Sequence, residues 1–275
     1  MNVLLSFLIQ IFCLFPQQNV GQGTPTNGVT FVTTDVPLQR MFDRAEELAK
    51  ENIVMYGSKR VMIEGAQYRS VWLETQPMGG VMYAKRDIDI AKNNVEIFME
   101  YQRSDGRFPG VIYNRDGKIV PNYCQFQGFY FPMPAFELYF ILDHDTLFLK
   151  KLYAALEAFD SYLWRTRDSD GNGCLESWCI YDTGEDNCVR YNGFPNAWDF
   201  EYPPSPEIAK RLTKEELQIH CKQIFYDSTE KMVVPIESMD VMSYSYSCRD
   251  VLSLIAKELH NGKEKVWRTK AEEVK

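Results

Sequence analysis

The stretch DTLFLKKLYAALEAFDSYL, residues 145–163, decides the fold class of this chain. Its apolar side chains recur every three or four residues, which places them on one face of an α-helix. That face consists of Leu149, Leu152, Tyr153, Leu156, Phe159 and Leu163. Asp145 precedes them, and its carboxylate is suited to accept the free N–H groups of a first helical turn. The stretch therefore predicts a helix with one buried face.

The same pattern appears earlier in the chain. Asp35 is a helix cap with Pro37 in the first turn, and the helical spacing that follows ends at Gly57. Further helices are expected over residues 85–101 and 129–142. The intervening residues 58–83 are expected to be irregular because they contain several glycines, and a small hairpin is expected around residues 116–117.

Helices also dominate the later part of the chain. Thr213 and Glu216 form a capping-box pattern that predicts a short helix. A long helix is expected over residues 240–259 and is closed by Gly262, and a last one starts near Lys263. It still continues at residue 275, from which we expect a longer natural chain. In total the sequence predicts six or seven helices, little strand, and long loops of the kind that carry function.

Composition excludes some functions. The chain has 275 residues and a net charge of −8, and no run of Lys or Arg stands out. A nucleic-acid-binding surface needs a basic stripe, so no nucleic-acid partner is expected. Aromatic residues make up 14% of the chain. They are compatible either with a large core or with platforms that stack on sugar rings.

The first residues resemble a secretory signal. Val3 to Phe15 form an uncharged apolar run, too short to span a bilayer, and small residues follow at 20–23. We expect residues 1–23 to be a signal peptide, 24–34 a linker and 35–275 a catalytic domain of a secreted or lumenal protein. The alternative is a mis-assigned start. Six of the seven cysteines follow residue 23, an even count that is compatible with disulfides of undetermined pairing.

A loop at residues 168–173, DSDGNG, resembles the start of a calcium-binding loop. Its twelfth position should be a bidentate Glu, but this position is Cys179, so the interpretation fails its most demanding requirement. Weak calcium binding remains an alternative to a simple turn rich in Asp and Asn. The spacing of the three cysteines at 174, 179 and 188 does not match a zinc site, so no metal and no cofactor is expected.

A cluster of acidic residues follows this loop. Four carboxylates lie close together in the chain, next to Trp178 and Tyr181: Glu176, Asp182, Glu185 and Asp186. Glycosidic bonds are cleaved by two carboxyl groups, one of which must stay protonated near neutral pH. A crowded acidic loop near aromatic rings can supply such an environment. The alternative is a solvated surface loop.

The order of these motifs resembles the six-hairpin glycosidases, in particular the trehalase-like and processing α-glucosidase-like enzymes. The stretch Gly184-Glu185-Asp186-Asn187 is similar to their Gly-Trp-Asp-Asn/Asp-Ser motif, in which the Asp is the general acid. The resemblance therefore implies that Asp186 is the proton donor, with Glu176 as the fallback carboxylate. This chain departs from the motif at Glu185, where the family has Trp, and at Cys188, where it has Ser.

Three more stretches carry the resemblance. WLETQPMGG at residues 72–80 resembles the loop that lines the sugar pocket, QRSDGRFPG at 102–110 resembles a family loop, and Asp240 matches the start of a barrel helix. The implied fold is all-α, an (α/α)6 toroid of twelve helices, of which this chain supplies about the first half. The general base comes from a loop late in such barrels, and no part of this chain matches it. The implied reaction is hydrolysis of a saccharide with inversion.

We expect a glycoside or oligosaccharide to be bound by side chains from these loops and from the loop before the helix at 129–142, although each has an alternative role in the core or in a salt bridge. The candidates are Trp72, Glu74, Gln76, Arg103, Arg107, Gln125, Gln127 and Trp178. Two rival functions remain open. One is a catalytically inactive, carbohydrate-binding relative, and the other is a helical toroid that binds a protein partner.

Overall fold

The computed structural model describes residues 29–126, 131–182, 188–194, 197, 204, 208, 210–220, 225–226, 228–229, 232–233 and 236–275. Within them, eight α-helices are present: α1 (Val36–Glu51), α2 (Gln76–Tyr83), α3 (Ile88–Glu100), α4 (Pro132–Ile141), α5 (Thr146–Thr166), α7 (Lys214–His220), α8 (Met239–Glu258) and α9 (Glu264–Glu272). The strands are β1 (Ile53–Tyr56), β2 (Lys59–Met62), β3 (Ser70–Trp72), β4 (Val111–Arg115), β5 (Lys118–Asn122), β6 (Phe225–Tyr226) and β7 (Met232–Val233).

The predicted helix starts are confirmed, because the expected side chains cap them. Asp35 Oδ1 accepts a hydrogen bond from the Leu38 amide at 3.0 Å. Asp145 Oδ1 accepts from the two amides at 147 and 148 at the start of α5. Thr213 and Glu216 form the reciprocal capping box of α7, in which each backbone N–H donates to the side chain of the other residue.

The prediction for residues 52–83 is wrong in part. Helix α1 ends at Glu51, and the chain continues directly into the antiparallel β1–β2 hairpin, in which Ile53 lies opposite Met62. The stretch expected to be irregular also contains β3 and α2. Gly80 lies inside α2, where an added Cβ would be 2.7 Å from the Cβ of Asn94 on α3. Glycine therefore allows two helices to pack closely here rather than breaking one.

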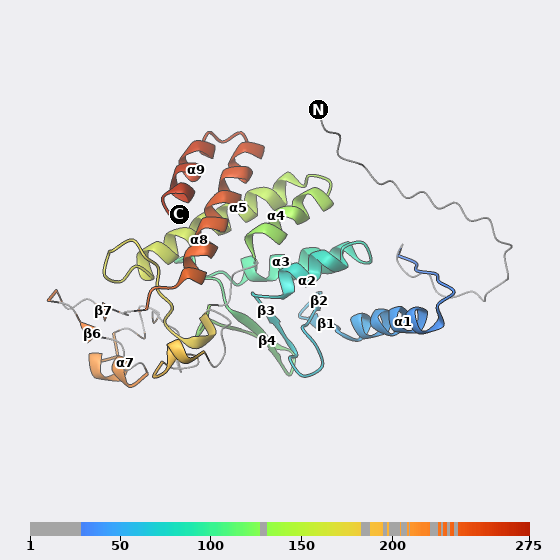
Figure 1. Ribbon diagram of the computed structural model, residues 1–275, viewed down its shortest axis with the longest axis horizontal. Coiled ribbons are helices and arrows are strands. Elements are labelled where there is room, and N and C mark those ends of the chain that lie inside the picture. The colour runs from blue at the N-terminus through green and yellow to red at the C-terminus, as the bar shows by residue number, and fades with distance from the viewer. Residues whose placement is uncertain are drawn as a thin grey trace, which may run out of the picture.

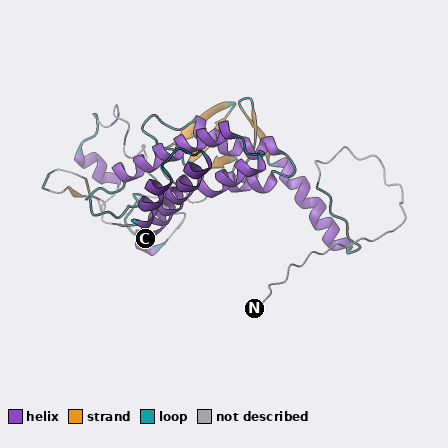
Figure 2. Cartoon of the chain, turned by 90° about the horizontal axis from the view of Figure 1, so that it is seen from above, coloured by secondary structure: helices purple, strands orange, loops and turns teal. Residues whose placement is uncertain are grey.

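The helices form a layer with the strands on one side of it (Figures 1 and 2). Helix α8 packs against α4, α5 and α9, and α2 packs against α3 and α4. Aromatic rings fill the space between them: Phe159 contacts Phe126 and Tyr244 with centroid distances of 5.2 and 5.7 Å. Helix α1 projects from the body and has no buried residue (Figure 1).

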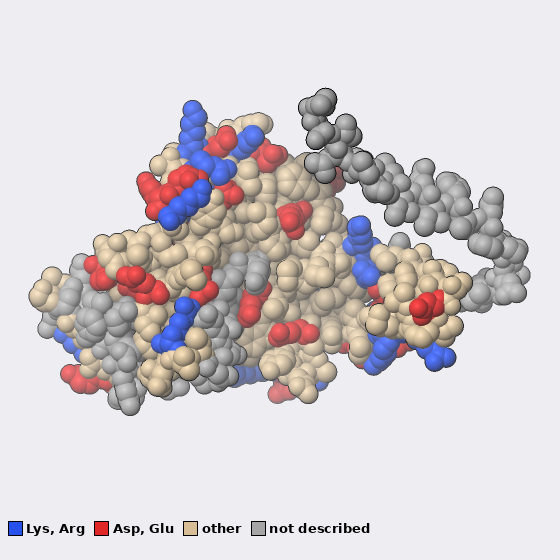
Figure 3. Space-filling model, in the orientation of Figure 1, with Lys and Arg blue, Asp and Glu red and all other residues tan. Residues whose placement is uncertain are grey.

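Strands β3, β4 and β5 form an antiparallel sheet in this order, which confirms the hairpin predicted at residues 116–117. On the face shown in Figure 3, Lys and Arg side chains lie over α9, where Asp and Glu are interspersed with them, and around α1. Within the described part of the chain, no helix has the combined length and apolar character that crossing a bilayer requires.

Candidate active site

A cavity of about 490 Å³ lies between the sheet and the loops that follow β5 and α5. Its lining combines aromatic and polar side chains: Glu64, Tyr68, Trp72, Glu74, Tyr113, Gln125 and Tyr181. Three of the predicted binding residues, Trp72, Glu74 and Gln125, are thus brought together here. Tyr113, Tyr68 and Glu64 were not predicted, because they come from stretches without a motif.

The sheet positions one wall of this cavity. In the antiparallel pairing of β3 with β4, Ser70 lies opposite Tyr113 and Trp72 lies opposite Val111. Alternate residues of a strand share a face, so these four residues lie on the same face of the sheet. The strand register therefore sets Trp72 diagonally next to Tyr113.

A buried carboxylate positions the opposite wall. Asp182 accepts hydrogen bonds from the Phe126 amide at 2.7 Å and from the Trp178 amide at 2.9 Å. It also forms a buried ion pair with Arg167, which follows α5. Burial alone would raise the pKa of Asp182, but Arg167 and the amides outweigh burial and lower it. Asp182 thereby fixes the neighbouring residues Gln125 and Tyr181 beside each other.

Gly110 allows these two walls to meet. An added Cβ at this position would lie 2.4 Å from the carbonyl oxygen of Gln125 and 2.8 Å from that of Phe126. The Gly110 carbonyl also accepts a hydrogen bond from the Leu73 amide at 2.9 Å. Gly110, the last residue of the QRSDGRFPG stretch, is therefore required by the close approach of the Gln125 and Phe126 carbonyls.

The cavity offers groups that can bind hydroxyls. Partial burial raises the pKa of the Glu64 carboxyl, and burial raises that of the Tyr113 hydroxyl. The Trp72 indole N–H is buried and has no hydrogen-bond partner among the described residues. A sugar hydroxyl is a suitable acceptor for such a donor, and the aromatic rings offer faces for the apolar side of a sugar.

Two of the predicted binding residues, Gln76 and Trp178, bond to neighbouring protein groups and do not line the cavity. Gln76 is 5% exposed, and its side-chain oxygen accepts hydrogen bonds from the Trp72 amide at 2.7 Å and from the Thr75 hydroxyl. Trp178 is buried, and its indole N–H donates to Glu176 at 3.3 Å.

The two predicted arginines also lie outside the cavity lining. Arg103 forms an ion pair with Asp105, whose pKa is lowered although burial opposes the shift. Arg107 is 2% exposed and donates to the Tyr162 hydroxyl on α5 and to the Tyr123 carbonyl. Arg107 therefore holds the loop after α3 against α5, whereas the Arg103–Asp105 ion pair lies within that loop.

Asp186, the predicted general acid, and Gln127 lie outside the described residues. Their expected roles stay predictions. Asp186 follows the cavity-lining Tyr181 by five residues in the sequence, and Gln127 follows Gln125 by two.

The loop that resembled a calcium site forms Asp/Asn turns. Asp170 accepts from the Asn172 amide at 3.1 Å, Asn172 from the Cys174 amide at 2.8 Å, and Asp168 from the Gly173 amide at 3.2 Å. This is the turn alternative that the sequence allowed. Among the described residues, the cysteines at 174, 179, 188 and 248 are free thiols.

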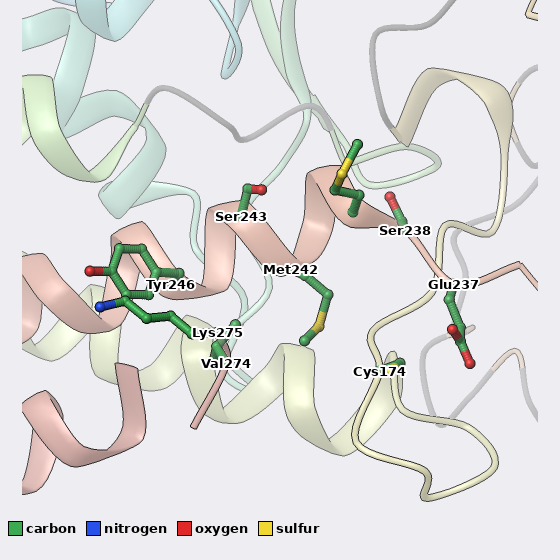
Figure 4. A pocket seen from close by; sticks show the side chains of 9 residues that line it. Cys174, Glu237, Ser238, Met242, Ser243, Tyr246, Val274 and Lys275 are labelled. Atoms are coloured by element: carbon green, nitrogen blue, oxygen red, sulfur yellow. The ribbon is translucent and has the colours of Figure 1, made fainter. Parts of the chain in front are cut away.

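A second cavity, of about 590 Å³, lies along α8 (Figure 4). Its lining includes Met239, Met242, Tyr246 and the last two residues, Val274 and Lys275. It mixes these sulfur and apolar groups with polar side chains such as Glu237, Ser238 and Ser243, and none of the predicted site residues lines it. The first cavity, where three predicted binding residues meet, is therefore the better candidate for the substrate.

Solved structures of similar fold come from Thermus thermophilus. They include a GH63 mannosylglycerate hydrolase in complex with Tris (TM-score 0.59, 18% identity) and in complex with Tris and D-glycerate (TM-score 0.58, 18% identity). An uncharacterised conserved protein from the same organism matches with a TM-score of 0.58 and 18% identity. These matches cover 84% of this chain but only 61–63% of the solved chains. No curated protein was found to match the sequence.

The likeness confirms the predicted fold class, the (α/α)6 toroid of the six-hairpin glycosidases, of which this chain forms a part. The family described as the mannosylglycerate hydrolase MGH1-like glycoside hydrolase domain matches residues 81–275. This match spans most of the chain, including β4, β5 and all helices from α3 onward. The chain therefore belongs to the MGH1-like glycoside hydrolase family.

Proposed function

We propose that this protein hydrolyses an O-glycosidic bond of a small glycoside that is bound in the cavity between the sheet and the Asp182 loop. The observation that carries the proposal is the cavity lining in a member of a glycoside hydrolase family. The lining combines aromatic rings from Trp72 and Tyr113 with polar groups from Glu74 and Gln125. This combination suits a sugar ring, which has apolar faces and a hydroxylated edge.

We assign the general acid to Asp186. It belongs to the acidic segment that begins directly after Asp182, the residue that fixes the cavity wall. As a general acid it would protonate the leaving glycosidic oxygen. In an inverting reaction a second carboxylate activates a water on the opposite face of the sugar, and we assign no residue to this role.

Mannosylglycerate is the first substrate to test, because the solved relatives from Thermus thermophilus include a mannosylglycerate hydrolase. A complex of that enzyme with glucose, matched with a TM-score of 0.54, makes α-glucosides the second choice. Aryl α-mannosides and aryl α-glucosides give a direct optical readout of the same bond cleavage.

The test compares the full chain with Asp186→Asn. We expect the variant to lose about 10²- to 10⁴-fold in kcat, the usual contribution of a general acid. Asp116→Asn, in the exposed turn between β4 and β5, is the matched control and should keep full activity. Undiminished hydrolysis by Asp186→Asn would exclude this residue as the acid. NMR of the first-formed product anomer decides between inversion and retention.

Calorimetric titration separates the rival functions. Sugar binding that is lost in Trp72→Ala, without any turnover, would support the carbohydrate-binding alternative. If the chain neither binds nor hydrolyses these compounds, the protein-partner alternative gains support.

A further inference from the structure

Glu176 joins two distant parts of the chain. Its backbone pairs with Glu237 in an isolated antiparallel bridge, and the adjacent Ser177 amide donates to the Ile236 carbonyl at 3.2 Å. The Ser238 amide, at the start of α8, donates to the Leu175 carbonyl at 2.8 Å. Glu176 is 2% exposed. Its side chain therefore lies in the interior, between the loop after α5 and the start of α8.

The Glu176 carboxyl is held by three neutral donors. Oε1 accepts from the Ser169 amide at 2.8 Å and from the Ser169 hydroxyl at 2.6 Å, and Oε2 accepts from the Trp178 indole N–H at 3.3 Å. The nearby Arg167 donates to the Glu176 backbone carbonyl and forms its ion pair with Asp182 instead. No ion pair of the Glu176 carboxyl with a cation is found among the described residues.

This environment determines the charge of Glu176. Burial, assisted by the negative charge of Asp170, raises the pKa of Glu176 to about 7 against the opposing effect of the Ser169 and Trp178 donors. The carboxylate of Glu237 accepts from the Asn172 side chain at 2.9 Å, on the exposed side of the bridge. Glu176 is therefore poised to change its charge near neutral pH.

Trp178 is the link from Glu176 to the candidate site. Its ring is stacked under Arg167, with the guanidinium carbon 4.1 Å from the ring centroid, and its amide donates to Asp182. It also packs in a small cluster with Tyr191 and Phe194. Asp182 directly precedes residues 183–187, and Tyr191 and Phe194 follow them in the sequence. Trp178 therefore contacts both flanks of the segment that contains Asp186.

We propose that Glu176 is a positioning residue for the hydrolysis proposed above, because its ionised carboxyl holds Trp178, and through it both flanks of the acidic segment, more firmly than the protonated form does. The inference rests on the proposed function and adds to it a pH-dependent anchoring of Trp178 beside Asp182 and Tyr191. Glu176 is not among the residues that line the cavity. It acts through the Trp178 indole.

The direct test is NMR of the Trp178 indole N–H in the full, ¹⁵N-labelled chain. Trp178→Phe assigns its cross-peak among those of the five tryptophans. We expect the cross-peak to shift between pH 5.5 and 8.5 with a midpoint near pH 7, and Glu176→Gln to abolish this titration. A Trp178 signal that does not titrate, or that titrates unchanged in Glu176→Gln, would overturn the proposal.

Two further variants move the midpoint in opposite directions. Ser169→Ala removes a donor that favours the carboxylate, so the midpoint should rise. Asp170→Asn removes a repelling charge, so the midpoint should fall. Shifts in the same direction for both variants would contradict the assignment to Glu176, whether or not the variants change the stability of the fold.

Activity supplies the functional readout. We expect the pH profile of kcat to contain a limb with a midpoint near pH 7 that is absent in Glu176→Gln, with KM changed less than about two-fold. If the wild-type chain hydrolyses glycosides but keeps this limb in Glu176→Gln, the positioning role is wrong. If no glycoside is hydrolysed, the proposed function fails, and the NMR titration still decides whether Glu176 controls Trp178.

Discussion

Two buried ion pairs of this protein use the same three residue types, Arg, Asp and Trp, but differ in what else reaches the carboxylate. The first pair lies inside the helical layer. Arg249 on α8 contacts Asp160 on α5 with an Nε–Oδ1 distance of 2.7 Å, and its guanidinium carbon lies 4.2 Å from the ring centroid of Trp164. Arg249 is the only donor recorded for this carboxylate among the described residues.

The second pair lies beside the candidate cavity. Arg167 stacks on Trp178 at 4.1 Å and binds Asp182, which also accepts two backbone amides. The pKa values of the two carboxyls move in opposite directions: burial outweighs Arg249 and raises that of Asp160, whereas Arg167 and the amides overcome burial at Asp182. The comparison teaches that Arg167, joined by the Trp178 amide, outweighs burial at Asp182, whereas Arg249 does not outweigh burial at Asp160.

The largest expected effect is that of Asp182→Asn. The variant turns an amide N–H₂ toward backbone N–H groups and leaves Arg167 without its counter-charge, so it should lower the free energy of unfolding by about 4 kcal/mol. Urea denaturation followed by circular dichroism measures this change. Asp143→Asn, at an exposed position with φ of 51° that Asn tolerates, is the control and should change stability by less than about 0.5 kcal/mol.

The effect of Asp182→Asn should depend on pH. The folded-state pKa of Asp182 lies below its unfolded value of about 4, so its contribution is complete above that pH and is lost as the pH falls through the folded pKa. The difference in the free energy of unfolding between wild type and Asp182→Asn should therefore become smaller below about pH 4. If this difference stays constant down to pH 2, the pKa of Asp182 is not lowered.

Asp160→Asn should have a smaller effect, about 2 kcal/mol. Asn keeps an acceptor for Arg249 Nε, and Arg249 retains its hydrogen bond to the Lys270 carbonyl at 3.0 Å. The pKa of Asp160 is raised, so its stabilising contribution is greatest below about pH 4 and declines as the pH rises through the folded pKa. The two Asp variants should thus show opposite pH slopes in the same denaturation experiment. If the stability differences caused by Asp160→Asn and Asp182→Asn change with pH in the same direction, the opposite pKa shifts of the two carboxyls are wrong.

The smallest effect is expected for Ser245→Ala. The Trp164 indole N–H donates to the buried Ser245 hydroxyl at 2.9 Å, where the Trp178 indole has a carboxylate instead. Loss of this neutral hydrogen bond should cost about 1 kcal/mol, measured by the same denaturation. Ser243→Ala, exposed on the same helix, is the control. The NMR signal of the Trp164 indole N–H should not titrate near pH 7. A titration like that expected for Trp178 would show that the two tryptophans do not differ in this respect.

The helices could be predicted from the sequence because their signals are local. Apolar spacing and the caps at Asp35, Asp145 and Thr213 identify the starts of α1, α5 and α7, although the end of α1 was placed too late. The β1–β2 hairpin and α2 could not be predicted in this way. Gly80 looks like a loop residue in the sequence, and only the approach of Asn94 from α3 explains it.

The candidate site could be predicted in part. Trp72 and Glu74 lie in a stretch with a motif, Gln125 was predicted from its place in the loop before α4, and all three line the cavity. Tyr113 has no motif around it, because the register of β3 with β4 brings it to Trp72. Arg107 shows the opposite difficulty. Its motif predicted that it binds the sugar, but its buried guanidinium donates to the Tyr162 hydroxyl and the Tyr123 carbonyl.

The Asp182 carboxylate has a consequence for the energetics of ligand recognition. Because it ties the main chain at Phe126 to that at Trp178, the cavity segments at Gln125 and Tyr181 are anchored to each other by protein alone. A ligand entering between them and the sheet meets backbone that is already in place. Binding then requires little ordering of loops, which would otherwise reduce the affinity. Even a molecule as small as a disaccharide can therefore keep most of the binding free energy that its contacts supply.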